Sequence, residues 1–321
     1  MTDYDYILAS KAAWYYYAES LTQQQISYVL GVSRVKIARL LELARKNGLV
    51  KISFRQESSY RMKAESELIS SFLLRDAFII PAATSQSSSI VDLISRAAAS
   101  YIGARLPDNG FLNIGYGVTT SHILGYLAHE NEKHISVVSL TGGVNYYLPT
   151  INSDLRSIKL YLIPSPLFLS SPEVRDEMYN EPDIKMITQM SSHADMTVIS
   201  VGGMTSNTTI INNNILTKND LTLLRMQGAV GDILSHFIDS KGNPVASSFE
   251  STIISTSLNE LSSFKNVICV AAGREKIPVL FAALRKKYID VLITDEPTAE
   301  ALLIQQAKQK NQELGDGTIE Y

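Results

Sequence analysis

The sequence predicts an α/β protein of two domains, a small winged helix-turn-helix followed by a larger Rossmann-like domain with a mostly parallel sheet. Two helix-start patterns lie within residues 22–36, and strand-like apolar runs alternate with helical stretches from residue 77 onward. Charge is also divided unevenly. Residues 1–55 carry eight Lys or Arg and four Asp or Glu, whereas the rest of the chain is acidic. We therefore expect a basic domain at 1–56 and a second domain at 57–321.

The helix-turn-helix is predicted from its helix-start signals. Thr22 opens a Thr-x-x-Gln capping box and Ser33 repeats the start signal, each flanked by apolar residues at the spacing of a hydrophobic staple. Gly31 lies in the tight connection between the two helices, and Gly48 ends the second one. A preceding helix at about 6–19 is expected to pack on them through Ala13, Trp14 and Tyr17.

The second of these helices is predicted to read DNA. Ile37, Leu40, Leu41 and Ala44 fall on one face, and Arg34, Lys36 and Arg39 fall off that face. This is the pattern of a recognition helix, whose N-terminal part enters the major groove. The strand-like "GLVKISFR" that follows would form a wing, with Lys51 and Arg55 near phosphate. The candidate DNA-binding residues are Thr22, Gln23, Gln24, Ser33, Arg34, Val35, Lys36 and Arg39.

A charged helix face has a simpler interpretation, because such faces are usually just solvated. A basic helical bundle that binds a protein, or nothing, would show the same charge. The capping box, the doubled staple, the glycine and the one-sided charge occur together here, and their combination favours DNA.

The second domain is predicted from apolar runs that read as strands, at 77–82, 111–116, 135–140, 158–163, 196–201, 266–271 and 289–294. Short polar or glycine-rich turns follow most of them. Ligands of open α/β sheets bind at the carboxyl ends of the strands, so we expect a site among these turns.

The chemistry of these turns indicates a small, anionic, hydroxyl-rich ligand. "GYGVTTS" at 115–121 offers two glycines, hydroxyls and the start of a helix, which suits an oxyanion. "TGGV" is a second such loop, and "AAGREK" adds Arg274 and Lys276. Asp232, in "GAVGDILSHFID", is placed to accept hydrogen bonds from sugar hydroxyls. Each glycine also fits a plain strand-to-helix turn, and Asp232 also fits a helix cap.

Other classes of protein are disfavoured by the residues present. The single cysteine, Cys269, fits a reducing compartment. The sequence shows no signal peptide and no run of about 20 apolar residues. We therefore expect a cytoplasmic protein that enters no membrane. The five histidines have no metal-ligand spacing, so no metal or cofactor is expected. His122 and His236 read more simply as structural than as ligand contacts. An enzyme acting on sugar phosphates remains the alternative, with Asp232 and His236 as its acid/base pair.

Over residues 8–305 the chain resembles the SorC family of transcriptional regulators. The resemblance is carried by "YYYAESLTQQQISYVLGVSRVKIARLLELARKNGLVKI", "GYGVTT", "LTGGV", "IPSPLFLSS", "GAVGDILSHFID" and "TDEPTAEALL". It implies an N-terminal helix-turn-helix and an effector domain whose fold is similar to sugar-phosphate isomerases. It also implies operator DNA and a phosphorylated sugar or polyol as partners, in a homo-oligomer, typically a tetramer. Within the family, the autoinducer-2 (lsr) and sorbitol types look most similar.

The resemblance also implies roles for single residues. Gly117, Thr119 and Thr120 would hold phosphate, and Gly142 and Gly143 would add backbone N–H groups. Asp232 would hold ligand hydroxyls, and Lys276 would approach the phosphate. The family often has a second glycine where this chain has Ala272-Gly273, so contacts at that turn differ from the family pattern.

Overall fold

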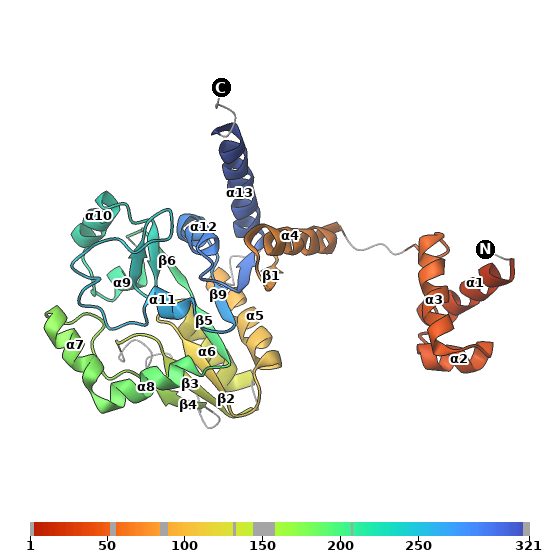
Figure 1. Cartoon of the computed structure of the whole chain (residues 1–321), viewed down its shortest axis with the longest axis horizontal. Coiled ribbons are helices and arrows are strands. Elements are labelled where there is room, and N and C mark those ends of the chain that lie inside the picture. The colour runs from red at the N-terminus through yellow and green to blue at the C-terminus, as the bar shows by residue number, and fades with distance from the viewer. Residues whose placement is uncertain are drawn as a thin grey trace. The chain divides into compact units, whose positions relative to one another are not determined.

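The structure is a computed structural model that describes residues 3–51, 56–83, 89–130, 133–143, 158–206 and 208–316. The chain divides into two compact units, Met1–Ser59 and Tyr60–Tyr321 (Figure 1). The division falls within helix α4 (Gln56–Phe72). The domain boundary after residue 56 stays a prediction.

The N-terminal unit contains α1 (Asp3–Tyr17), α2 (Gln23–Leu30) and α3 (Arg34–Lys46). The predicted capping box of α2 is present, since the Gln25 N–H donates to Thr22 Oγ1 and the Thr22 N–H donates to Gln25 Oε1 at 2.9 Å. Gly31 ends α2 with φ 64°, a conformation that favours glycine. Ser33 caps α3 by accepting the Lys36 N–H at 3.2 Å. The local sequence therefore determines both the turn and the start of the second helix.

The core of this unit confirms one part of the sequence prediction and corrects another. Leu8, Ala9, Ala12 and Ala13 of α1 are buried together with the four buried residues of α3, Ile37, Leu40, Leu41 and Ala44. Trp14 and Tyr17, expected to pack here, are exposed instead. The expectation therefore holds for Ala13, which is buried in this core, and is wrong for Trp14 and Tyr17.

The residues predicted to form the wing are only partly described by the structure. Residues 49–51 form no strand, and residues 52–55 of the wing, including Arg55, lie outside the described residues. The winged form of the helix-turn-helix therefore stays a prediction.

The larger unit is built on a sheet whose described strands all pair in parallel, as predicted. The strand order is β1-β10-β9-β5-β2-β3-β4. The strands are β1 (Asp76–Ile80), β2 (Gly110–Ile114), β3 (Ile135–Ser139), β4 (Ile158–Tyr161), β5 (Met196–Ile199), β9 (Val267–Val270) and β10 (Val291–Asp295).

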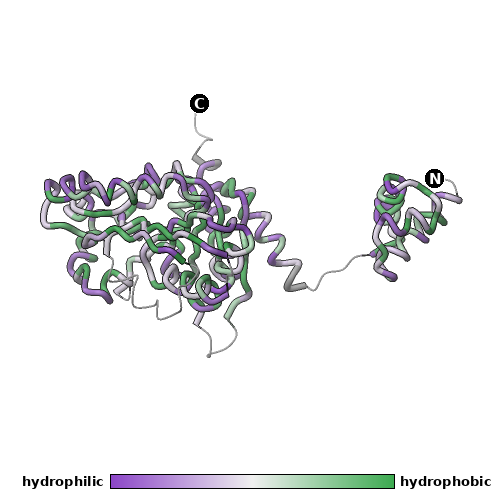
Figure 2. Tube along the Cα trace, turned by 90° about the horizontal axis from the view of Figure 1, so that it is seen from below, coloured by the Kyte–Doolittle hydropathy of each residue, from purple (hydrophilic) through white to green (hydrophobic). Residues whose placement is uncertain are grey.

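Helices cover both faces of this sheet because its central strands are apolar on both sides. On β9, Val267 and Cys269 belong to one core, while Ile268 and Val270 belong to the other. The first core includes α4, α12 (Ile277–Arg285) and α13 (Glu296–Asp316). The second includes α5 (Ile90–Arg105) and α6 (Val118–Glu130). Figure 2 shows hydrophobic segments gathered inside the larger unit.

A second, antiparallel sheet was not predicted. It contains β6 (Val201–Gly203), β7 (Gly231–Ile233) and β8 (His236–Ile238), in that order. The predicted strand 196–201 is thus divided between the two sheets at Ser200, and Asp232 lies in a strand rather than in a loop. The other described helices of this unit are α7 (Pro172–Asn180), α8 (Pro182–Ser192), α9 (Thr209–Asn212), α10 (Lys218–Met226), α11 (Leu258–Leu261) and the 3₁₀ turn η2 (Arg274–Lys276).

Candidate functional site

The exposed face of α3 carries the candidate DNA-binding side chains. Arg34, Val35, Lys36 and Arg39 are all exposed, and the buried residues of the helix lie on its other side. Three of the four are cations, which suit phosphate or guanine. The exposed Val35, in the first turn, suits contact with a thymine methyl group.

The remaining candidates of this unit position the reading helix or flank it. Thr22 and Ser33 use their side-chain oxygens to cap α2 and α3. Gln23 and Gln24 begin α2, where Gln24 is exposed and Gln23 half-buried. The structure therefore gives the two hydroxyl residues a local structural task in addition to any contact with DNA.

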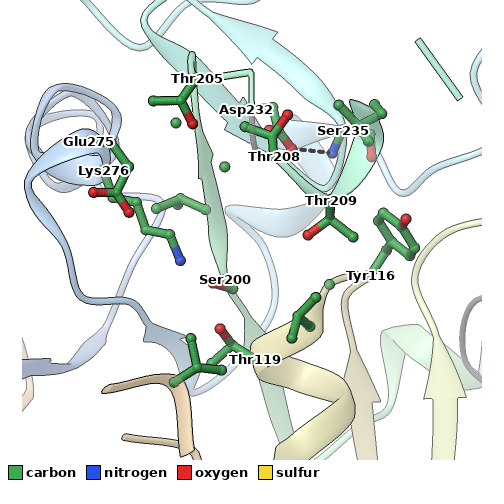
Figure 3. A pocket seen from close by; sticks show the side chains of 17 residues that line it. Tyr116, Thr119, Ser200, Thr205, Thr208, Thr209, Asp232, Ser235, Glu275 and Lys276 are labelled. Carbon is green, nitrogen blue, oxygen red and sulfur yellow. Dashed lines mark hydrogen bonds between the residues drawn. The ribbon is translucent and has the colours of Figure 1, made fainter. Parts of the chain in front are cut away.

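The larger unit contains a cavity of about 270 Å³ near the carboxyl ends of β2 and β5 (Figure 3). Its polar lining comes from the turn before α6, the link between β5 and β6, the segment leading into α9, the β7–β8 hairpin and η2. These side chains belong to Tyr116, Thr119, Ser200, Thr205, Thr208, Thr209, Asp232, Ser235, Glu275 and Lys276. Segments more than 150 residues apart in the chain thus contribute to one site.

One carboxylate oxygen of Asp232 accepts a hydrogen bond from the chain itself. The Ser235 N–H donates to its Oδ2 at 3.1 Å. Its Oδ1 lies over Gly202, where a Cβ would come within 2.0 Å of that oxygen. Burial raises the pKa of Asp232 to about 6, with the Ser235 N–H and the Lys276 charge acting in the opposite direction. At pH 7 this carboxylate is mostly ionised and can accept hydrogen bonds from hydroxyl groups.

Lys276 is the cation of the cavity. Its side chain extends into the cavity in Figure 3. Its ammonium group makes no hydrogen bond or ion pair with any residue that the structure describes. Burial lowers its pKa, and the nearby Cys269, Glu275 and Asp232 oppose that shift. A largely desolvated cation without a close protein partner provides a binding point for an anionic group.

The start of α6 brings only part of its predicted set to the cavity. Gly117 and Thr119 line it, and Gly117 has φ 147°, in the region that favours glycine. Thr120 is buried and does not line the cavity, because its hydroxyl donates to the Gly117 carbonyl at 2.9 Å. The N-terminal amide groups of α6 add a partial positive charge at this position.

The two glycines of "TGGV" are not brought to this cavity. The Gly142 N–H donates to the Ile254 carbonyl at 2.8 Å, and the Gly143 N–H donates to the Ser165 carbonyl at 2.7 Å. Both donors are therefore engaged within the chain. Their predicted role toward phosphate would require these two hydrogen bonds to break.

The pair considered for acid/base chemistry is not assembled. His236 is buried, with Nδ1 2.9 Å from Glu250 Oε1 and Nε2 3.0 Å from the Thr256 carbonyl. It does not line the cavity that holds Asp232. Both ring nitrogens are used structurally, which is the simpler of the two interpretations that the sequence allowed.

Several lining residues were not identified as candidates from the sequence. Thr205, Thr208 and Thr209 come from the segment after the "GGM" turn, and Ser235 follows the strand that holds Asp232. Thr208 Oγ1 is buried and has no hydrogen-bond partner among the residues that the structure describes. A run of hydroxyl residues after a glycine turn was visible, but it has no period that indicates which way the side chains point.

Two absences concern only the described residues. They contain no cluster of three or more His, Cys, Asp or Glu side chains suited to a metal ion. None of their helices has the length and hydropathy needed to span a bilayer.

Comparisons with known proteins agree with this arrangement of a helix-turn-helix and a ligand cavity. Residues 57–304 match the family model described as "Putative sugar-binding domain". The chain is 31% identical over 300 residues to the transcriptional regulator LsrR of Klebsiella pneumoniae, covering 92% of each chain. It is 29% identical over 298 residues to LsrR of Escherichia coli K12, covering 92% of this chain and 93% of that one.

Two solved structures share the fold. The full-length sorbitol operon regulator SorC of Klebsiella pneumoniae superposes with a TM-score of 0.67 at 22% identity, covering 94% of this chain and 99% of that one. A DeoR family regulator of Listeria monocytogenes gives 0.68 at 21% identity, covering 76% and 99%. The chain thus belongs to the SorC family of transcriptional regulators with a sugar-binding domain.

Proposed function

We propose that this regulator binds operator DNA through α3 and controls a carbohydrate-uptake or catabolism operon in response to a phosphorylated sugar or polyol. The effector binds in the cavity of the larger unit, and phosphorylated autoinducer-2 belongs to this chemical class. The protein acts in the cytoplasm as a homodimer or homotetramer. Binding of the effector weakens DNA binding and so relieves repression.

The observation that carries the proposal is the Lys276 ammonium group beside a wall of hydroxyls and the Asp232 carboxylate. Lys276 lines the same cavity as the N-terminus of α6, which favours anions. The hydroxyls of the ligand then face Asp232 and the threonines. Such a cavity matches a ligand with one anionic end and a polar, uncharged body.

Regulation is favoured over catalysis by two observations. The relatives are named transcriptional regulators. The side chain that an isomerase mechanism would need, His236, is buried between Glu250 and Thr256.

The test measures binding of full-length protein to its upstream DNA by fluorescence anisotropy, with a panel of sugar phosphates and the matching unphosphorylated sugars. We expect a phosphorylated compound to weaken DNA binding about 5- to 150-fold, the usual range of allosteric coupling. The unphosphorylated partner has little effect, and Lys276→Met removes the response. Equal responses to both forms of the sugar would contradict the assignment of phosphate to Lys276. A protein that does not bind the DNA at low salt would contradict the whole proposal.

A further inference from the structure

The first turn of α13 adjoins two segments that lead to different parts of the larger unit. β10 pairs in parallel with β1 on one side and with β9 on the other, so the segments after these three strands leave the same edge of the sheet. α13 follows β10 directly. Its neighbours at this edge are the segment after β1 and the η2 turn after β9, which holds Lys276 of the cavity.

Thr298 connects this first turn to the cavity. Its Oγ1 accepts the Gly273 N–H at 3.0 Å, and its own N–H donates to Asp295 Oδ1 at 3.2 Å. Gly273 directly precedes η2, whose last residue is Lys276. The turn is tight, since Gly273 has φ 117° and a Cβ there would lie 2.5 Å from Glu275 Oε1. A ligand that displaces Lys276 therefore acts on the hydrogen bond to Thr298.

Glu296 connects the same turn to α4 (Figure 1). Its Oε1 pairs with Arg61 Nη1 at 2.9 Å, and its Oε2 accepts the Ala82 N–H at 3.1 Å. The side chains of Arg61 and Glu296 are only 23% and 25% exposed, although 235 residues separate them in the chain. Removal of one partner would leave the other charge largely desolvated, so the pair holds its two helices firmly. The hydrogen bond from Ala82 fixes the direction of the carboxylate.

Arg61 lies where α4 leaves the core of the larger unit. The buried residues of the helix begin at Ala64 and recur at Leu68 and Phe72. On the other side of Arg61, Tyr60 is 48% exposed, and the chain continues to the N-terminal unit. A helix end outside the core opens more easily than the rest of the helix. The pair with Glu296 is therefore placed to determine how the start of α4 is held.

We propose that Glu296 couples the effector cavity to the N-terminal unit. Through Arg61 it holds the start of α4, and through the adjoining Thr298 it responds to the turn that contains Lys276. This inference rests on the proposed function, since it names the residues that carry the allosteric response. Contiguous contacts are not in themselves coupling, which requires that both sites bias one element. A purely structural ion pair would affect stability and leave the coupling unchanged.

The first measurement determines the coupling factor in the full-length protein, with the phosphorylated compound that the anisotropy screen selects. This factor is the Kd for DNA with saturating effector divided by the Kd without effector, and about 5–150 is expected for the original chain. Glu296→Gln keeps an oxygen for the Ala82 N–H and removes the charge that pairs with Arg61. We expect its factor to fall below about 2, while the Kd for effector alone and the Kd for DNA alone each change less than about threefold.

Glu313→Gln is the matched control, because it makes the same substitution further along α13 and removes the ion pair with Arg285. It should keep the factor of the original chain. Arg61→Met breaks the proposed pair from its other side and replaces Glu296→Gln if that variant fails to fold. The double variant should have the factor of either single variant, since both substitutions act through one contact.

Thr298 tests the cavity end of the connection. Thr298→Val removes the acceptor of the Gly273 N–H and should lower the factor as Glu296→Gln does. Thr298→Ser keeps the hydroxyl group and should retain the factor. Loss of the factor in the valine variant alone would thus assign the effect to this hydrogen bond.

Amide hydrogen exchange without DNA or effector reports on the ion pair itself. Glu296→Gln and Arg61→Met should raise the exchange rates of the amides of residues 60–64 at least about fivefold and leave those of residues 68–72 unchanged, because only the start of α4 is released. Unchanged exchange at residues 60–64 would overturn the proposal, since the pair would then not hold the start of α4.

The coupling measurement separates this inference from the proposed function. An unchanged factor in Glu296→Gln, beside a normal response of the original chain, would overturn the inference and leave the proposed function intact. An equal fall in Glu313→Gln would also overturn it, because any loss of charge on α13 would then have the same effect. A factor of 1 in the original chain would contradict the proposed function, and this inference with it.

Discussion

Gly202 faces Asp232 in the register between β6 and β7, and a Cβ at Gly202 would lie 2.0 Å from Asp232 Oδ1. Gly202→Ala must therefore push the carboxylate out of position. We expect the Kd for the effector to rise at least tenfold, about 1.4 kcal/mol, while DNA binding without effector is unchanged. Calorimetry with the effector found in the anisotropy screen measures the change.

Gly125→Ala is the matched control for this substitution. Gly125 lies in α6, and its added Cβ would meet nothing within 4 Å. The change should leave effector binding unaltered and should stabilise the helix by about 0.5–1 kcal/mol. Unchanged effector affinity in Gly202→Ala would show that the carboxylate does not contact the ligand.

The pKa of Asp232 makes the site sensitive to pH. Its pKa of about 6 in the folded chain lies above the ordinary 3.8, so the folded chain binds this proton more tightly than the unfolded chain does. Protonation of Asp232 therefore adds to the free energy of unfolding. This stabilisation is complete below pH 4 and is lost as the pH rises through 6. Effector binding needs the carboxylate, so effector affinity should fall as the pH drops below 6.

Asp232→Asn separates this effect from the titration of the phosphate itself, whose second pKa is also about 6. The variant should bind the effector weakly at pH 7 and should lose only the part of the pH dependence that belongs to Asp232. Identical pH profiles for the two proteins would exclude Asp232 as the responsible group.

At the scale of the element, α3 is held by its cap and its buried face, and its cations are exposed. Arg39→Ala should weaken binding to all DNA sequences alike and reduce the slope of log K against log salt by about 1, since one phosphate contact is lost. Anisotropy over a series of salt concentrations measures the slope. Lys218→Ala, at an exposed cation of α10, is the control and should leave the slope unchanged. A change at one base pair only would instead assign Arg39 to base reading.

The elements also show what a single sequence can predict. The caps at Thr22 and Ser33 and the apolar runs of the parallel strands follow local rules, and the structure contains them. β7 and β8 have three residues each, too short for any periodicity; they pair with each other, and β7 also pairs with β6. For α1, apolar residues on both sides gave no way to tell from the sequence which side packs on α3.

For the candidate site, the chemistry of the single turns was predictable from the sequence. Which of these turns meet in one cavity was not. Lys276 was selected because polar groups after strands collect at one sheet edge, and Asp232 was selected from the distinctive string that holds it; both line the same cavity. Gly142 and Gly143 follow the same rule, but their N–H groups donate to carbonyls of distant segments. Only the folded chain shows which turn is already satisfied by its neighbours.

At the scale of the whole molecule, the proposed coupling is reciprocal. If the effector lowers the affinity for DNA by a given factor, DNA must lower the affinity for the effector by the same factor. We expect that factor to lie between about 5 and 150, or about 1–3 kcal/mol. Anisotropy gives the first value, and calorimetry with and without saturating DNA gives the second.

Two variants distinguish a change in the coupling between effector and DNA from a change in the binding of either one. Arg39→Ala should weaken DNA binding yet keep the factor, because Arg39 belongs to the reading helix and the effector acts on the equilibrium between states. Asp232→Asn should keep DNA binding and, at concentrations that saturate the original protein, show little response to effector. An effector that binds tightly while the factor stays at 1 would mean that the two units do not communicate, because a ligand shifts an equilibrium only by its difference in affinity for the two states.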